Sequence, residues 1–196
     1  MEFQDLVKTR RSCRSFEASP VSEEQLNAIL DAGRWAPNPL NLQSWEFIIV
    51  TEGETKAQIR AVAEEAKQDV IGKGGPGWVT KYKMDCLEEA PVLVVVVFDP
   101  SRGGLGGFFD QNYGAIQAAS ACVQNMVLAA ADMGFGSLWF TFFRPAKLQA
   151  VLNIPENLEV AAVVPIGRPR GAIETPPRKD PKVHRQRYGS ASEAVA

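Results

Sequence analysis

The stretch PVLVVVVF, residues 91–98, decides the fold class. β-Branched residues follow one another there without the polar alternation of a strand that has one face in solvent. We therefore expect a strand that other elements cover on both faces. Three further apolar runs, at residues 45–50, 137–143 and 159–167, are predicted to be strands as well.

Helical patterns separate these predicted strands. The clearest helix start is Ser22 with Gln25 three residues later, which is a capping box. Glycine at position 134 is a stop signal after a long Ala-rich helix. Strands and helices mixed in this way are typical of an α+β domain with a sheet between helices. Helices are expected over residues 2–11, 22–35, 54–69, 79–89, 110–133 and 145–152.

The composition is that of an ordinary globular chain. Of its 196 residues, 45% are hydrophobic and 22% are charged, and the net charge is −2 at pH 7. A chain of this length can bury a sizeable core as one domain. The slightly acidic balance argues against a nucleic-acid or membrane-surface binder, because those partners require a broad positive face.

No segment is predicted to enter a membrane or to direct secretion. Polar residues interrupt the long apolar stretch 114–134, and a lipid core tolerates such residues poorly. The cations near the start of the chain are not followed by an apolar run. We therefore expect a soluble, cytoplasmic protein with no membrane partner.

The chemistry available to side chains is restricted by the cysteines and the histidine. The three cysteines form no CxxC pair, and His184 is the one histidine of the chain. These counts argue against a disulfide framework, histidine-based nucleophilic catalysis and multi-histidine metal sites. We expect reduced thiols, with Cys13 pointing into the core, and no metal site.

Cations gather in two places. The stretch KTRRSCRSF, residues 8–16, holds four of them within seven positions. After Gly167 the chain becomes rich in proline, arginine and lysine and almost lacks aliphatic residues, which predicts an extended arm without a core of its own. We expect one domain over residues 1–167 and an arm over 168–196 that packs on the domain or on a partner subunit. A nucleic-acid contact by the arm is an alternative that fits poorly with the acidic whole.

Four segments in sequence order resemble the nitroreductase family of FMN-dependent oxidoreductases. They are KTRRSCRSF, APNPLNLQSWEFIIV (36–50), GFGSLWF (134–140) and the pair PIGRP (165–169) and PPRK (176–179). The resemblance extends from Phe3 to about Tyr188. It implies an α+β, nitroreductase-like fold with a central, mostly antiparallel β-sheet flanked by helices. It also implies an intertwined homodimer with FMN at the subunit interface.

The arginine-rich segment RRSxR of that family holds the phosphate of FMN, and it matches Arg10, Arg11, Ser12 and Arg14. A phosphate monoester carries about −1.5 to −2 charge and pairs well with the forked guanidinium group. By the same resemblance, Arg178 in PPRK returns to this phosphate or to the ribityl chain.

Two further segments correspond to the family's ring contacts. The loop 37–44 is implied to lie against the flavin held mainly by the partner chain, although Asn38, Pro39 and Ser44 depart from the family pattern. The segment 139–142 is implied to run beneath the ring and to offer a backbone N–H towards flavin N5. Lys83 is a further candidate for a polar contact, with a solvated surface cation as the alternative. The implied cofactor contacts are Asn38, Pro39, Leu40, Asn41, Gln43, Trp139, Thr141 and Phe142.

The implied reaction needs no catalytic side chain, because the flavin carries the chemistry. NADH or NADPH reduces FMN, leaves, and is replaced by a small-molecule acceptor such as a nitroaromatic or a quinone. Two alternatives stay open. One is a specialised flavoenzyme of the same fold that dehalogenates, oxidises a heterocycle or consumes the flavin. The other is a flavin-binding module without turnover.

Overall fold

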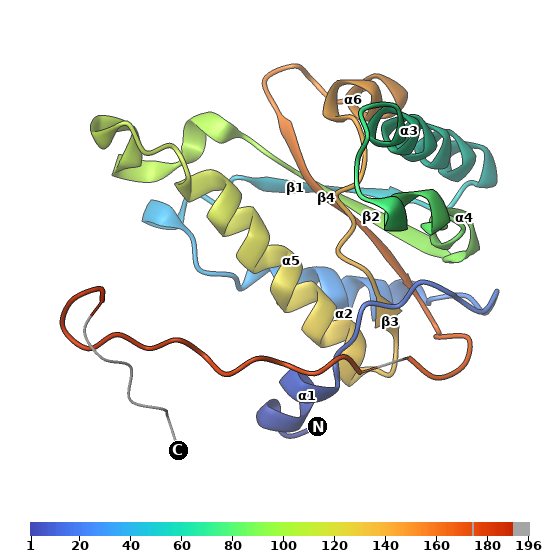
Figure 1. Ribbon diagram of the computed structural model, residues 1–196, viewed down its shortest axis with the longest axis horizontal. Helices are drawn as coiled ribbons and strands as arrows, with labels where there is room; N and C mark the ends of the chain where they lie inside the picture. Colours follow the sequence, from blue (N-terminus) through green and yellow to red (C-terminus); the bar gives the residue numbers. More distant parts are fainter. Residues whose placement is uncertain (174, 190–196) are drawn as a thin grey trace.

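The centre of the molecule is a four-stranded antiparallel sheet with the order β1-β2-β4-β3 (Figure 1). The computed structural model describes residues 1–173 and 175–189. β2 lies in the middle, paired with β1 on one side and β4 on the other. The predicted α+β class with a mostly antiparallel sheet is confirmed. The strands are β1 (Trp45–Val50), β2 (Val92–Phe98), β3 (Gly136–Ser137) and β4 (Glu159–Gly167).

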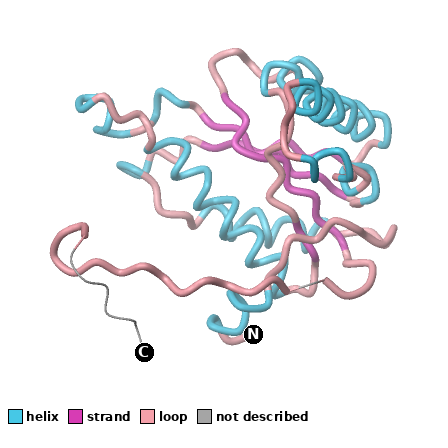
Figure 2. The backbone as a smooth tube through the Cα atoms, viewed as in Figure 1, coloured by secondary structure: helices cyan, strands magenta, loops and turns pink. Residues whose placement is uncertain are grey.

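Two layers of helix cover the sheet. One contains α2 (Glu23–Arg34) and α5 (Gly114–Asp132), and the other contains α3 (Gly53–Gly72), α4 (Cys86–Glu89) and α6 (Pro145–Leu152) (Figures 1 and 2). β2 is buried along its whole length, and its side chains alternate between the two layers. The prediction of a strand covered on both faces is therefore confirmed.

The packing of α2 on α5 depends on a capping box and a glycine. Gln25 N donates to Ser22 Oγ at 3.2 Å, and Ser22 N donates to Gln25 Oε1 at 3.0 Å, as the sequence predicted. Further along α2, a Cβ atom on Gly33 would lie 2.8 Å from the Cγ of Met126 on α5. Only the absence of a side chain at this position allows the two helices to approach so closely.

Two predicted helices are shorter than expected. The helix 79–89 is wrong as a continuous element, because a 3₁₀ turn, η2 (Gly77–Lys81), is separated from α4 by Tyr82 in an extended conformation. The Tyr82 ring packs between Trp78 and another aromatic side chain, Phe142, which accounts for the break. The helix expected from residue 110 begins at Gly114, since Asp110 has a left-handed conformation with φ of 55°.

The predicted strand 137–143 is also mostly wrong. Only Gly136–Ser137 belong to the sheet, and an isolated bridge joins Phe140 to Val163. Leu138 N and Phe140 N still donate to carbonyls of β4. The remaining short elements are α1 (Phe3–Thr9), η1 (Pro39–Asn41), η3 (Pro100–Arg102) and η4 (Gly104–Phe109).

After β4 the chain forms an extended arm without helix or strand in its described part, residues 168–173 and 175–189 (Figure 2). Its root is fixed by backbone bonds from Glu17 N to Arg168 O (2.9 Å) and from Arg170 N to Ser15 O (3.0 Å). Residues 174 and 190–196 of the predicted arm lie outside the described residues. The division into a domain of residues 1–167 and an arm stays a prediction.

One helix within the described ranges, α5, is long and apolar enough to cross a membrane by length and composition. Of the window that meets this test, 44% is buried inside the fold. A core helix meets the same test.

Candidate functional site

The arginine-rich segment lies beside β3 because residues 12 and 13 join that strand. Cys13 N donates to Ser137 O at 2.9 Å, and Ser12 forms a parallel bridge with Ser137. In an extended segment successive side chains point to opposite sides. Cys13 is therefore buried in the core, as predicted, while its neighbours Ser12 and Arg14 line cavities.

The predicted phosphate contacts meet around one cavity of about 150 Å³, which we call the cation cavity. One wall comes from the segment after α1 and the other from the arm. The lining residues are Arg10, Arg11, Ser12, Arg14, Pro176 and Arg178. The structure thus brings together residues from opposite ends of the sequence.

Positive charge is concentrated in the cation cavity. Burial lowers the pKa of the Arg10 guanidinium, and the nearby charges of Arg11 and Arg178 lower it further. Arg11 is oriented by bonds from its Nε to Thr175 Oγ1 (3.2 Å) and from its Nη1 to Arg10 O (2.7 Å). A bound anion would relieve the repulsion within such a cluster.

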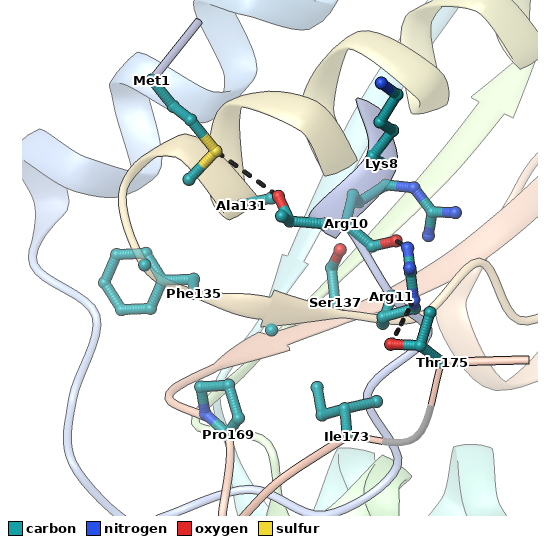
Figure 3. Close-up of a pocket in the computed structure, with 13 residues that line it drawn as sticks. Met1, Lys8, Arg10, Arg11, Ala131, Phe135, Ser137, Pro169, Ile173 and Thr175 are labelled. Carbon is teal, nitrogen blue, oxygen red and sulfur yellow. Dashed lines mark hydrogen bonds between the residues drawn. The ribbon is translucent and has the colours of Figure 1, made fainter. Parts of the chain in front are cut away.

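A second cavity, of about 370 Å³, shares Arg10 and Arg11 with the cation cavity (Figure 3). It is bounded by α1, the C-terminal end of α5 and the arm, and it adds Lys8 to the cationic side chains. Phe135 and Ile173 give it an apolar wall. Arg10 and Arg11 thus line two cavities, and the positive field extends beyond the cation cavity.

The third cavity, of about 570 Å³, is aromatic. It shares Ser12 and Arg14 with the cation cavity, so the cation cavity borders a large apolar trough. Its aromatic lining comes from η2, the residue after it and the segment that follows β3. The aromatic side chains are those of Trp78, Tyr82, Trp139, Phe140 and Phe142, and Thr141 lies among them.

The segment 138–142 presents backbone donors at this aromatic cavity. Leu138 N and Phe140 N bond to β4, so the alternate amides, that of Trp139 between them and that of Thr141 after them, face away from that strand. Within the described residues, neither of these two amides donates a hydrogen bond to another group. They are donors available to a ligand.

Sequence reasoning did not find Tyr82 and Trp78. Arg14 Nε donates to Tyr82 Oη at 3.4 Å, and the guanidinium lies 5.9 Å from the centre of the tyrosine ring. Trp78 contacts the same ring edge-on at 5.9 Å. Aromatic residues after a glycine-rich loop were a visible signal, but no spacing connected them with Arg14. The candidate Lys83 is exposed and lines none of these three cavities.

The loop 37–44 lies apart from the cation cavity. Asn38, Asn41 and Gln43 line a separate cavity of about 310 Å³ with Arg34 and Trp35. The loop cavity and the aromatic cavity have no lining residue in common.

Pro39 and Leu40 occupy the outer part of this loop. Pro39 packs against η4, where a Cβ atom on Gly104 would be 2.6 Å from the proline Cβ. The Leu40 side chain is 67% exposed. Within a single chain, the structure does not bring the predicted ring contacts of this loop to those of the segment 139–142.

An α+β fold with a cluster of cations beside an aromatic trough fits a protein that binds an anionic, flat ligand. The comparison with protein families is specific: the chain belongs to the nitroreductase family, whose model matches residues 7–168.

Individual relatives carry two kinds of name. A protein of Archaeoglobus fulgidus named "Putative NADH dehydrogenase/NAD(P)H nitroreductase" is 30% identical over 191 residues, 93% of this chain and 97% of that protein. Iodotyrosine deiodinase of Thermotoga neapolitana is 27% identical over 184 residues, 90% of this chain and 93% of that protein.

A solved structure of oxidized iodotyrosine deiodinase bound to FMN and 3-iodo-L-tyrosine matches with a TM-score of 0.82 at 25% identity. The match covers 94% of this chain and 99% of that one. The sequence resemblance to the nitroreductase family is confirmed.

Proposed function

We propose that this nitroreductase-family chain is an FMN-dependent oxidoreductase that transfers electrons from NADH or NADPH to a small-molecule acceptor. The observation that carries the proposal is the convergence of Arg10, Arg11, Ser12, Arg14 and Arg178 on one cavity that borders an aromatic trough. A solved relative bound to FMN supports the same cofactor.

The chemistry of the cation cavity fits the phosphate end of FMN. A phosphate monoester brings about −1.5 to −2 charge and oxygen acceptors to a site with four guanidinium groups and a hydroxyl. Burial lowers the pKa of Arg10, and the charges of Arg11 and Arg178 lower it further. The cavity therefore has the sign of charge and the hydrogen-bond donors that a phosphate group requires.

The aromatic cavity fits the ring end. Trp139, Thr141 and Phe142 would lie against the ring system, and the amides of Trp139 and Thr141 would donate hydrogen bonds to its polar edge. When bound, FMN supplies the hydride chemistry, while the chain supplies binding and orientation. The trough supplies an apolar wall for the ring, and no side chain is assigned as an acid or a base.

We propose a homodimer in which the loop of one chain completes the ring site of the other. Leu40 is exposed, and the loop lies apart from its own aromatic cavity. The contacts proposed from the partner's loop are those at positions 38–41 and 43. The proposed setting is the cytoplasm, with a nitroaromatic, quinone or similar acceptor and without a nucleic-acid or membrane partner.

A second candidate is reductive dehalogenation of an aromatic compound by the same FMN site. The match to an iodotyrosine deiodinase at a TM-score of 0.82 is the observation that favours it. Both candidates use the same cofactor and differ in the acceptor.

The first test is the colour of the purified protein. We expect it to be yellow, or to become yellow on reconstitution with FMN, and to release FMN on denaturation. Protein that stays colourless and does not take up FMN would overturn both candidates.

The second test separates donor and acceptor. Anaerobic NADH or NADPH should bleach the flavin, and reoxidation by a nitroaromatic, a quinone or 3-iodotyrosine then identifies the acceptor class. Flavin that reacts with no donor and no acceptor indicates a binding module without turnover.

A further inference from the structure

Glu89, the last residue of α4, connects the two segments that supply the cation cavity. Its Oε2 accepts hydrogen bonds from Phe16 N (3.1 Å) and Ser15 Oγ (3.3 Å). Its Oε1 accepts from Arg170 Nη1 at 3.3 Å. One carboxylate therefore contacts both the continuation of the arginine-rich segment and the root of the arm.

Arg170 strengthens the same connection from the arm. Its Nη2 donates to Phe16 O, and its backbone N donates to Ser15 O at 3.0 Å. The chain thus pairs residues 15–17 with residues 168–170 through backbone bonds, and the ion pair between Glu89 and Arg170 spans that pairing. Ser15 directly follows Arg14, and Arg178 lies eight positions after Arg170 in the arm.

The bonds of Glu89 and Arg170 hold together two segments whose arginines repel one another at the cation cavity. Arg10 and Arg11 come from one segment and Arg178 from the other, and their like charges disfavour one another. Arg178 makes one bond to protein in the described chain, from its Nη1 to Pro176 O within the arm itself. Its place at the cavity therefore depends on how the arm is held, by the pairing at its root and by the bond from Arg11 Nε to Thr175 Oγ1 (3.2 Å).

We propose that Glu89 and Arg170 are positioning residues of the FMN phosphate site, because they hold the arm so that Arg178 stands beside Arg10 and Arg11. Neither residue lines the cation cavity or the aromatic cavity, so neither is placed to contact the cofactor directly, and the proposed route of action is through Arg178. The inference rests on the proposed function, since it assumes that the anion is the phosphate of FMN. A pre-positioned cation gains affinity because less conformational entropy is lost on binding.

The chain provides a matched control in the neighbouring residue. Glu88 carries the same carboxylate on the same short helix, but it pairs with Arg60 of α3. It makes no bond to residues 15–17 or to the arm within the described chain. Loss of its charge perturbs α4 without releasing the arm.

The experiment compares FMN with riboflavin, which has the same ring and ribityl chain but no phosphate. Dissociation constants of both ligands are measured by flavin fluorescence for the wild type, Glu89→Gln, Arg170→Met and Glu88→Gln. We expect FMN to bind about ten-fold more weakly to the first two variants. Riboflavin affinity in all variants, and FMN affinity in Glu88→Gln, should match the wild type.

A second background tests whether the residues act through the arm. In an Arg178→Ala protein, the additional substitution Glu89→Gln should change FMN affinity less than two-fold, because the cation that it positions is already missing. A purely structural role predicts instead that the two losses multiply. If Glu89→Gln fails to fold, Arg170→Met decides the question, since that side chain is 56% exposed.

The outcomes separate the two proposals. Wild-type protein that binds no FMN overturns the proposed function and this inference with it. Wild-type protein that binds FMN, with variants that bind it equally well or lose FMN and riboflavin to the same extent, overturns only the positioning role.

Discussion

The arginine-rich segment and the loop 37–44 were both expected to contact the same ligand, yet the fold treats them differently. The first meets the arm around one cavity, so its cations converge within a single chain. The second lines a cavity of its own beside α2 and leaves Leu40 in solvent. Under the proposed function, one chain supplies the cations of the phosphate site, whereas the loop of a partner subunit is proposed to complete the ring site.

The backbone of the loop supports this contrast. Leu40, Asn41 and Gln43 all have left-handed conformations, with φ of 51°, 53° and 46°. For a residue such as leucine this geometry costs of order 1 kcal/mol. Strained backbone of this kind is retained where a fixed loop shape serves a contact. Within the described chain, the exposed side of this loop, which carries Leu40, has no such contact.

The largest expected effect is the loss of FMN affinity when an arginine of the cation cavity is removed. Arg10→Ala removes a half-buried cation from the cation cavity, so FMN affinity should fall by about 1.5–3 kcal/mol. Calorimetric titration with FMN measures the loss, and Arg102→Ala is the control because it removes an arginine that lines none of these cavities. Unchanged FMN affinity in both Arg10→Ala and Arg14→Ala would remove the phosphate assignment.

The next effect tests whether the loop serves the partner subunit. Chains with Arg10→Ala are mixed with chains carrying both Asn41→Ala and Gln43→Ala, after unfolding and joint refolding. If each site of a two-fold symmetric dimer takes its arginine segment from one chain and its loop from the other, about a quarter of all sites become intact again. Half of the dimers contain one chain of each kind, and one of the two sites in each such dimer has no substitution. Flavin content and turnover measure the recovery.

The matched mixture for this test is Arg10→Ala with Arg14→Ala. Both lesions then lie on the same side of every site, so no intact site can form. Recovery in this control, or no recovery in the first mixture, would show that the loop does not complete the partner's site.

The sequence predicted the sheet better than the segment beside it. β2 and β4 are long apolar runs whose burial follows from composition alone, and the capping box fixed the start of α2. The segment 139–143 has equally strong β-propensity but forms only a bridge at Phe140. Propensity cannot tell a strand that joins a sheet from an extended segment whose alternate amides face a cavity.

The candidate site, like the fold, was predictable from the sequence only in part. The cations of residues 10–14 form a local signal, and the arm carries Arg178 in a recognisable PPRK stretch. Tyr82 reaches Arg14 only because the chain breaks between η2 and α4. Nothing in the spacing of the two residues encodes that approach, and the same holds for the contacts of Glu89.

A smaller expected effect is the dependence of stability on pH that arises from two buried thiols. Burial raises the pKa of the Cys86 thiol to about 11 and that of Cys122 to about 12. The folded state therefore holds these protons more tightly than the unfolded chain, whose thiols titrate near pH ~8.5. The contribution of these thiols to stability should be constant below that pH and should fall as the pH rises towards 11, by at most about 1.4 kcal/mol per pH unit for each thiol.

Urea denaturation between pH 7 and pH 10 measures this dependence. Cys122→Ala is the informative variant, because it should flatten the curve while leaving FMN affinity unchanged. A wild-type stability that stays constant or rises across this range would contradict the raised thiol pKa values.

The smallest expected effect is on stability and concerns the hydrogen bonds that hold the loop 37–44. Asn38 Oδ1 accepts a hydrogen bond from Gln43 N at 2.9 Å, and Asn38 Nδ2 donates to Ala36 O at 3.2 Å. These two bonds connect the ends of the loop, so Asn38→Ala should cost about 1 kcal/mol of unfolding free energy. Thermal unfolding of the flavin-free protein would then shift by about 2–4 °C.

Asn41→Gly is the matched control for this variant, because glycine accepts the left-handed φ of 53° at this position. Within the described residues, the Asn41 side chain accepts one hydrogen bond, from Gln43 Nε2 (3.1 Å), which joins two exposed side chains of the same loop. Its loss should leave the unfolding temperature within about 1 °C of the wild type, because exposed polar contacts contribute little to stability. If the two variants unfold alike, the shape of the loop is imposed from outside the chain. The partner subunit would then hold the loop as well as receive it.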